Sequence, residues 1–151
     1  MSDPQKNIPP GFFAMAMGGD FIAANGPFYL RHEGELVKLG FRVEARHTNP
    51  LGICHGGMMA TFCDMLLPIS IHRKSAEVGH RFLPTINLQL DYLAPVQLGA
   101  WVEGEAQVLR ATRSIVFAQG LVTADGVTAA RVSGIFKVGP VFTPPAGGDD
   151  A

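Results

Sequence analysis

The pattern of apolar and polar positions divides the chain into short alternating segments on either side of one long apolar stretch. From Gly57 to about Lys74 most residues are apolar, which predicts a helix that is buried on most of its sides. Before it, the segment PFYLRHEGELVKLGFRV predicts two short strands that turn at Glu33-Gly34. After it, four segments are strand-like: RFLPTINLQLDYL, AWVEGEAQVLR, SIVFAQGLVTA and VTAARVSGIFKV.

The turns between these segments favour an antiparallel arrangement. Asp125-Gly126 stands between two alternating segments and is the clearest hairpin signal in the chain. A strand pair, one buried helix and four further antiparallel strands together describe an α+β domain whose sheet covers a central helix. The apolar segment GFFAMAMGG near the N-terminus predicts a short helix that ends at Gly18-Gly19.

The length of the chain predicts a single domain, residues 1–151. This length is enough to bury one core but leaves little room for two. Residues 1–10 and 140–151 are rich in Pro, Gly and Asp, so we expect flexible tails there. The core of the domain should lie at about residues 28–138.

Composition predicts one kind of partner and argues against others. Apolar residues make up 47% of the chain and charged residues 17%, which predicts that further copies cover some apolar surface, in a homodimer or homotetramer. The net charge is −1 with basic residues scattered singly, which argues against a nucleic-acid partner. No apolar run reaches the roughly 20 residues that cross a bilayer, so we expect no membrane partner.

Two further features indicate where the protein works. The first residues fit neither a secretory signal nor an arginine-rich transit peptide. The only cysteines, Cys54 and Cys63, cannot form a disulfide framework, as is usual in a reducing compartment. We therefore expect a cytoplasmic protein.

The apolar helix carries a narrow polar stripe. At about 100° per residue, five residues fall within about 80° of one another: Gly57, Thr61, Asp64, Pro68 and His72. A carboxylate in apolar surroundings is costly unless it has a hydrogen-bond partner. Asp64 therefore either bonds a buried backbone group or takes part in chemistry, and the stripe alone leaves both open.

Gly56 and Gly57 stand where this helix begins. Backbone N–H groups at a helix N-terminus can polarise a carbonyl oxygen as negative charge develops on it, although two glycines also suit a tight turn. Gly56 lies ~12 Å from Asp64 along a helix, so one carbonyl group cannot contact both in the same chain. A site that uses both needs Gly56 of one copy and Asp64 of a second, related by a two-fold axis.

Together these residues resemble a known family. The stretch NPLGICHGG, the aspartate that follows its histidine along the helix, and LDYLAPVQLG further on resemble the hotdog-fold acyl-CoA thioesterases, in particular the phenylacetate-pathway subfamily, over about residues 28–138. The resemblance implies a hotdog fold and hydrolysis of an acyl-CoA thioester to free acid and CoA. It implies no metal and no organic cofactor.

The resemblance also implies roles for five residues. Asp64 would activate the attacking water or attack the thioester itself, and the Gly56 amide would polarise the thioester carbonyl. Asn49 would help to bind that carbonyl. His55 would position Asn49 or contact the substrate, unless it only fixes its loop by hydrogen bonds. Thr85 stands where such enzymes often carry a Ser or Thr that assists the water.

Strand alternation sets a condition on Thr85. In TINLQLDY, strict alternation places Thr85 on the same face as Asn87, opposite Ile86 and Leu88. If the apolar face covers the helix, Thr85 reaches the site only at an interface or through a bulge.

The anionic CoA moiety needs basic residues at the mouth of the site. Arg110, Arg113 and Ser114, around the turn RATRS, are candidates, and residues 72–74 at the end of the helix form a second cluster. Charged residues at such places are more often simply solvated, and a basic helix end also suits the helix dipole.

The identity of the acyl group stays open between an aromatic and a medium-chain group. Met58, Met59 and Phe62, together with the N-terminal segment GFFAMAMGGDF, could line an apolar pocket for either.

Three alternatives compete with hydrolysis. An enoyl-CoA hydratase would pair its catalytic residues in one loop, whereas here the carboxylate lies two turns along the helix. A non-catalytic acyl-CoA-binding protein would not need Asn49, Gly56 and Asp64 together. A metal site of Cys54, His55, Cys63 and His72 matches no compact zinc spacing.

Overall fold

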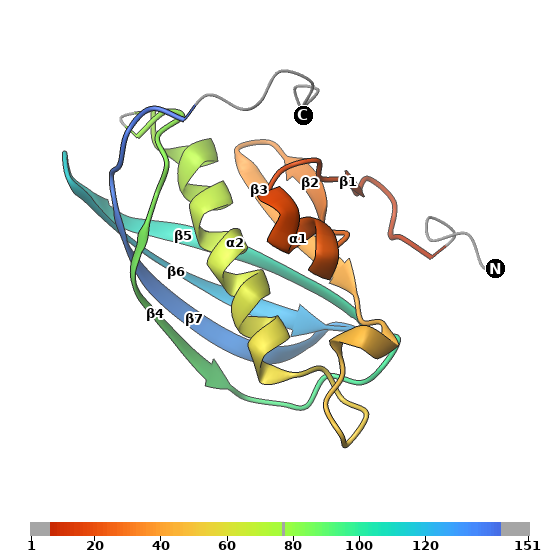
Figure 1. Cartoon of the computed structure of the whole chain (residues 1–151). Coiled ribbons are helices and arrows are strands. Elements are labelled where there is room, and N and C mark those ends of the chain that lie inside the picture. Colours follow the sequence, from red (N-terminus) through yellow and green to blue (C-terminus); the bar gives the residue numbers. More distant parts are fainter. Residues whose placement is uncertain (1–6, 77, 143–151) are drawn as a thin grey trace.

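The computed structural model describes residues 7–76 and 78–142. Within them, one long helix lies in the curve of an antiparallel sheet (Figure 1). The helices are α1 (Gly19–Asn25), the 3-10 helix η1 (Ala45–His47) and α2 (Gly56–Lys74). The strands are β1 (Phe13–Ala14), β2 (Tyr29–Glu33), β3 (Leu36–Arg42), β4 (Thr85–Tyr92), β5 (Trp101–Ala111), β6 (Ile115–Ala124) and β7 (Val127–Lys137).

The sheet places the first strand after α2 at its edge. Its order is β1-β2-β3-β5-β6-β7-β4, so β4 pairs with β7 rather than with the next strand in the chain. α2 packs against β3, β5, β6, β4 and β7. This arrangement confirms the predicted α+β hotdog fold, with an antiparallel sheet around a long central helix.

The core lies between α2 and the inner face of the sheet. Leu66 and Leu67 of α2 are fully buried, as are Val102 of β5 and Val132 of β7. The helix approaches the strands closely where glycines face it: a Cβ on Gly104 would lie 2.7 Å from the Leu66 side chain. Burial of apolar surface at roughly 25 cal/mol per Å² therefore holds the helix in place.

The predicted hairpin at Asp125-Gly126 is confirmed. Both residues adopt positive φ, 47° and 83°, as the mirror-image turns that suit twisted strands require. The turn between β2 and β3 follows Glu33, which pairs with Leu36, and so begins one residue later than predicted.

The predicted helix over residues 11–19 is wrong. Phe13 and Ala14 instead form β1, which pairs with Leu30 and Tyr29 of β2. Gly18 and Gly19 adopt positive φ, and the helix α1 begins at these glycines instead of ending there. The apolar density of this segment reflects tertiary packing, since Phe12 lies edge-on to Trp101 with ring centroids 5.0 Å apart.

The predicted tails lie only partly within the described residues. Residues 1–6 and 143–151 are outside them, whereas Val141 pairs with Arg81 in an isolated bridge. Among the helices that the structure describes, none combines the length and apolar character needed to span a bilayer.

Candidate active site

Asp64 and Thr85 meet where α2 passes the start of β4. The Thr85 hydroxyl donates a hydrogen bond of 2.6 Å to Asp64 Oδ1, and Asp64 is half-buried. The predicted polar stripe is therefore real at this point, and its carboxylate bonds a side chain rather than a buried backbone group.

A bulge brings Thr85 to the helix. Thr85 pairs with Phe136 and Asn87 with Ile135, so Ile86 is an extra residue in β4. A bulge shifts the alternation by one residue and places Thr85 on the inner face, where strict alternation would have turned it outward. The sequence allowed Thr85 to reach the site either at an interface or through a bulge, and the structure contains the bulge.

His55 caps the start of α2. Its side-chain Nδ1 accepts a 2.8 Å hydrogen bond from the Gly57 N–H, and its carbonyl accepts from the N–H groups of Met58 and Met59. Because Nδ1 is an acceptor, the neutral ring carries its proton on Nε2. The loop-fixing role that the sequence allowed for His55 is thus observed.

The cap leaves one N–H group unused. Among residues 7–76 and 78–142, the Gly56 N–H donates no hydrogen bond, while the Tyr92 hydroxyl donates a 2.7 Å hydrogen bond to the Gly56 carbonyl. An unpaired N–H at a helix N-terminus, with the positive end of the helix dipole behind it, can stabilise an oxyanion. Burial raises the pKa of Tyr92, so its hydroxyl remains a donor.

Asn49 orders the loop that leads to α2. Its Oδ1 accepts from the N–H of Leu51 at 3.0 Å and of Ile53 at 3.4 Å, an arrangement typical of Asx turns. The carboxamide NH2 donates to no acceptor within the described part of the chain. That group is therefore available for a carbonyl oxygen.

The two halves of the site lie at opposite ends of β4. Thr85, its first residue, contacts Asp64, and Tyr92, its last residue, contacts Gly56. Gly56 and Asp64 are thus separated by two turns of α2, ~12 Å. Within one chain the donor of the N-terminal half cannot serve a carbonyl group that the carboxylate attacks.

The candidate CoA residues lie at the Asp64 end. The turn between β5 and β6 contacts the end of β7, because the Val138 N–H donates to the Ser114 carbonyl, and β7 pairs there with Thr85. The side chains of Arg110 and Arg113 are exposed and have no hydrogen bond or ion pair to the described residues. They are available to an anionic group.

The second basic cluster, residues 72–74, is engaged with the backbone. His72 Nε2 lies 2.7 Å from the Arg81 carbonyl, Arg73 donates to the Gly34 carbonyl at 3.2 Å, and Lys74 donates to the Ala106 carbonyl at 2.6 Å. These bonds tie the end of α2 to the surrounding loops and strands, although all three residues are exposed to solvent.

The three expected pocket residues of α2 all belong to the core. Phe62 is fully buried between the rings of Phe28 and Phe41, and Met59 is also buried. Met58 alone reaches a hollow at the start of α2. The apolar wall of any acyl site must therefore come largely from elsewhere.

The cysteines are buried thiols. Burial raises the pKa of Cys54 to about 11 and that of Cys63 to about 12, so both stay protonated near neutral pH. In the described part of the chain, no three His, Cys, Asp or Glu side chains lie together as metal ligands would.

Sequence reasoning missed Tyr92 and His47. Tyr92 contacts a helix start that lies 36 residues earlier in the chain, and no local pattern shows such a contact. His47 is buried, and its ring bridges the Glu44 N–H and the Asn25 carbonyl. An isolated histidine between Arg and Thr gives no signal of burial.

Comparison with known proteins places this geometry in a family context. The Thioesterase superfamily sequence model matches residues 51–130. A Pseudomonas aeruginosa protein that carries an esterase name is 25% identical over 135 residues, covering 87% of this chain and 98% of that protein. Acyl-coenzyme A thioesterase 13 of Mus musculus is 30% identical over 79 residues, which cover 51% of this chain and 53% of that protein.

Solved structures share the fold. Zebrafish thioesterase superfamily member 2 has a TM-score of 0.68 at 25% identity, covering 81% of this chain and 87% of that one. A phenylacetic acid degradation-related protein from Ralstonia eutropha JMP134 has a TM-score of 0.69 at 20% identity, covering 80% and 92%. A Streptococcus pneumoniae thioesterase protein, crystallised with coenzyme A, has a TM-score of 0.68 at 14% identity, covering 83% and 100%.

Proposed function

This chain belongs to the thioesterase superfamily and is therefore a thioester hydrolase; we propose that its substrate is an acyl-CoA thioester, which it cleaves to the free acid and CoA by Asp64-assisted attack of water. The observation that carries the proposal is the 2.6 Å bond from Thr85 to Asp64, a carboxylate two turns along the helix that begins with the unpaired Gly56 N–H. The mouse relative is named for acyl-coenzyme A, and the Streptococcus pneumoniae neighbour was crystallised with coenzyme A, which supports this substrate class.

The chemistry follows from what each group can donate or accept. Thr85 occupies Asp64 Oδ1, which leaves Oδ2 to accept a proton from water as its oxygen attacks the thioester carbon. The Gly56 N–H and the Asn49 carboxamide stabilise the negative charge that develops on the carbonyl oxygen. When the tetrahedral intermediate collapses, the C–S bond breaks and the CoA thiolate leaves. With a thiol pKa near 8 to 9, the thiolate departs readily and takes its proton from Asp64 or from solvent.

We propose that each site is shared between two subunits. Gly56 and Asn49 of one subunit would face Asp64 of the partner subunit, because two turns of helix separate these groups in one chain. A two-fold axis then produces two equivalent sites. The subunit that supplies Asp64 would also supply the exposed arginines near it, Arg110 and Arg113. Together with Ser114, these would bind the phosphates of CoA.

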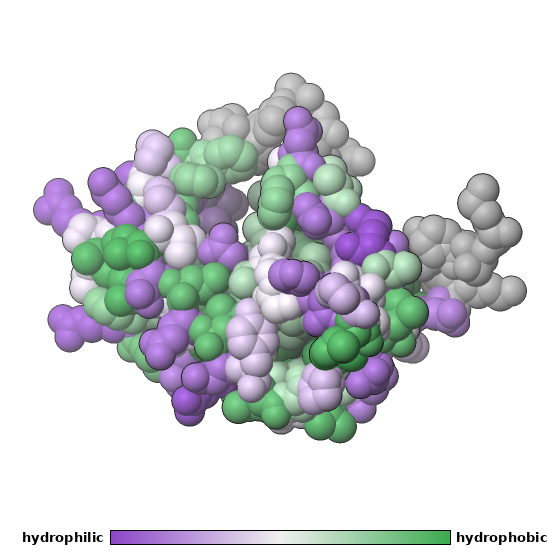
Figure 2. All heavy atoms as spheres, turned by 60° about the horizontal axis from the view of Figure 1, so that its bottom comes forward, coloured by the Kyte–Doolittle hydropathy of each residue, from purple (hydrophilic) through white to green (hydrophobic). Residues whose placement is uncertain are grey.

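The surface supports an oligomer. The outer face of the sheet exposes Ile86, Leu109, Phe117 and Leu121. Hydrophobic residues lie among hydrophilic ones on the left of Figure 2, where Figure 1 places β4 and β7. Apolar area of this kind favours a covered surface. The buried free thiols fit the reducing cytoplasm, in which we propose that the enzyme works.

A thiol-release assay over a panel of acyl-CoAs tests the function. Wild type should release CoA from at least one acyl-CoA, and Asp64→Asn should lower kcat by about 10²–10⁴. Asp91→Asn is the matched control, because Asp91 lies on the outer face of β4, paired with Arg131, and should leave kcat unchanged.

The other functions give different outcomes. Hydration of an enoyl-CoA without thiol release would identify a hydratase, and binding of acyl-CoA without turnover would identify a binding protein. Thiol release that persists undiminished in Asp64→Asn contradicts the proposed mechanism.

A further inference from the structure

A hollow of about 290 Å³ lies between α1, η1 and the first turns of α2. It is lined from α1 by Phe21 and Asn25, from the η1 side by residues 46–48, and from α2 by Gly57 and Met58. Its volume is at the lower end of the range for small-molecule sites. It suits a group much smaller than a whole acyl-CoA.

The hollow lies beside the first residues of α2, and its lining flanks Gly56 without including it. His55 and Gly57, the two chain neighbours of Gly56, both line it. A thioester carbonyl that accepts from the Gly56 N–H therefore has this hollow beside it. The carbonyl carbon of a thioester carries two substituents, the sulfur of CoA and the hydrocarbon part of the acyl group. Since the candidates for binding the phosphate-bearing CoA lie at the other half of the site, the hollow is left for the hydrocarbon part.

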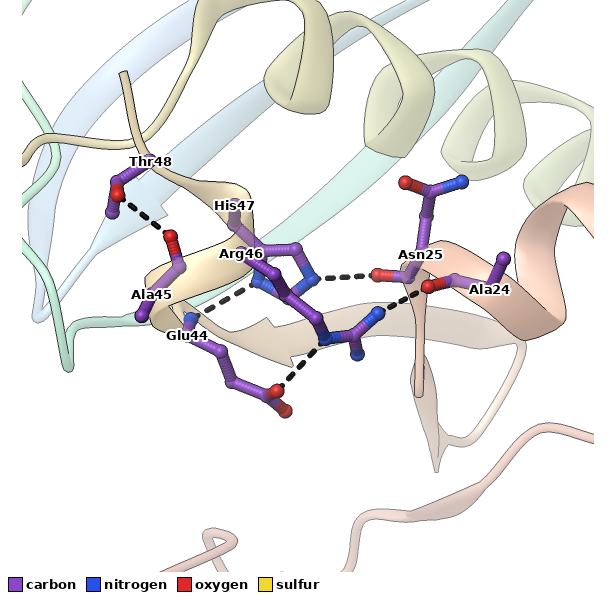
Figure 3. Close-up of polar contacts among 7 residues, drawn as sticks. All are labelled: Ala24, Asn25, Glu44, Ala45, Arg46, His47 and Thr48. Carbon is purple, nitrogen blue, oxygen red and sulfur yellow. Dashed lines mark hydrogen bonds and ion pairs between the residues drawn. The ribbon is translucent and has the colours of Figure 1, made fainter. Parts of the chain in front are cut away.

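The wall that α1 forms is held mainly by hydrogen bonds. Ile22 is the one buried residue of this seven-residue helix. At its C-terminal end, Arg46 donates to the Ala24 carbonyl and His47 Nε2 lies 2.7 Å from the Asn25 carbonyl (Figure 3). These two bonds fix where α1 stands relative to the start of α2.

Arg46 and His47 are themselves fixed by Glu44. The Glu44 carboxylate accepts from Arg46 Nε at 3.0 Å, and the Glu44 N–H donates to His47 Nδ1 at 3.0 Å (Figure 3). The His47 ring also lies edge-on to Phe41, with centroids 5.5 Å apart. The wall is therefore held in one position before any ligand binds.

Phe21 is the residue of α1 that offers apolar surface. It is 64% exposed, although it lines the hollow, and its one apolar counterpart there is Met58, which is buried. A large exposed aromatic side chain on a fixed wall gains free energy when an apolar ligand covers it. The remaining lining is polar or glycine.

We propose that Phe21 is a specificity-determining residue: it covers the acyl group in this hollow and favours single-ring or medium-length acyl groups over acetyl. This inference rests on the proposed acyl-CoA hydrolysis. Acetyl extends only one methyl group beyond the carbonyl carbon and offers Phe21 little apolar surface to cover, so we expect its turnover not to depend on that side chain.

The test compares kcat/KM for acetyl-, hexanoyl- and phenylacetyl-CoA. Phe21→Ala should lower kcat/KM about tenfold for the hexanoyl or phenylacetyl substrate, because an aromatic contact in a pocket contributes about this discrimination, and should change acetyl-CoA turnover less than about twofold. For the hexanoyl and phenylacetyl substrates, kcat/KM of Phe21→Leu should lie between the values of Phe21→Ala and wild type. Phe13→Ala is the control, since Phe13 is an exposed phenylalanine on β1 outside the hollow, and it should match wild type.

The outcomes separate this inference from the function on which it rests. If wild type releases thiol from no acyl-CoA, the proposed function fails. If wild type is active but Phe21→Ala lowers kcat/KM equally for all three substrates, or for none of them, Phe21 does not contact the acyl group and only this inference is overturned. Because Phe21 is mostly exposed, the variant should fold, and its circular dichroism spectrum checks this directly.

Discussion

The Thr85 hydroxyl donates to Asp64 Oδ1 across 2.6 Å, which joins the first residue of β4 to the third turn of α2. The bond orients the carboxylate and commits one of its two oxygens. The geometry depends on the bulge at Ile86, so a local irregularity of the sheet determines the position of the residue that we expect to act on water.

Removing this hydroxyl should slow the chemical step. Thr85→Ala leaves Asp64 in place but frees its rotation, so kcat should fall about 10- to 100-fold while KM changes little. Thr85→Ser keeps the hydroxyl and should retain most of the activity. Steady-state thiol release on both variants gives the comparison, and equal activity of the Ala and Ser variants would show that the hydroxyl has no catalytic role.

Gly56 can be tested by removing its N–H without removing the helix. Gly56 is the first residue of α2 after the cap, and His55 before it has φ −62° and ψ 137°. Proline is well suited to the first helical position and to an extended preceding residue. Gly56→Pro should therefore fold and lower kcat by about 10²–10³, as loss of one oxyanion donor does.

Gly56→Ala is the matched control for this change. It keeps the N–H, and its Cβ would lie 3.4 Å from the Tyr92 ring and hydroxyl, an ordinary contact. It should stay close to wild type in thiol release. If the alanine variant loses as much activity as the proline variant, then space near Tyr92 matters and the N–H does not.

The fold could be predicted largely from the sequence because its signals are local. The apolar stretch after Gly57 became α2, and Asp125-Gly126 became the hairpin turn between β6 and β7. The N-terminal segment could not be predicted in the same way. Its apolar residues pack against Trp101 and pair with Leu30, and both partners lie too far along the chain for local periodicity to indicate them.

The candidate site was predictable where a residue conflicts with its surroundings. Asp64 was found because a carboxylate is unusual in an apolar helix, and Gly56 because two glycines begin that helix. Tyr92 and His47 are a tyrosine at a strand end and a histidine after a loop, which are ordinary in themselves. Their contacts with Gly56 and Asn25 exist only once β4 and η1 are folded against α2 and α1.

A shared site predicts complementation between inactive variants. Gly56→Pro and Asp64→Asn should each be nearly inactive alone. After the two are mixed and allowed to exchange subunits, each mixed dimer has one intact site and one site with both changes. Because half of the dimers are mixed, activity should recover to about a quarter of wild type.

The control for complementation is a mixture in which no intact site can form. Asp64→Asn mixed with the double variant that carries both changes should stay inactive. A size measurement by light scattering belongs with this experiment, since an active monomer would contradict the shared site, as would a mixture that never recovers although subunits exchange.

His47 predicts a loss of stability in acid. Burial lowers its pKa from the ordinary histidine value, outweighing the Asn25 carbonyl and Glu44, while Arg46 lowers it further. Protonation would also end the bond from the Glu44 N–H to Nδ1. The unfolded chain therefore binds a proton near pH 6.5 that the folded chain binds only at lower pH, so the free energy of unfolding should fall as pH drops below about 6.5.

Urea unfolding at about pH 7.5 and about pH 5.5 should show this fall in wild type. His47→Gln should show a smaller fall, whereas His80→Gln, at an exposed histidine, should behave as wild type does. An identical pH dependence in wild type and His47→Gln would assign the effect to other groups.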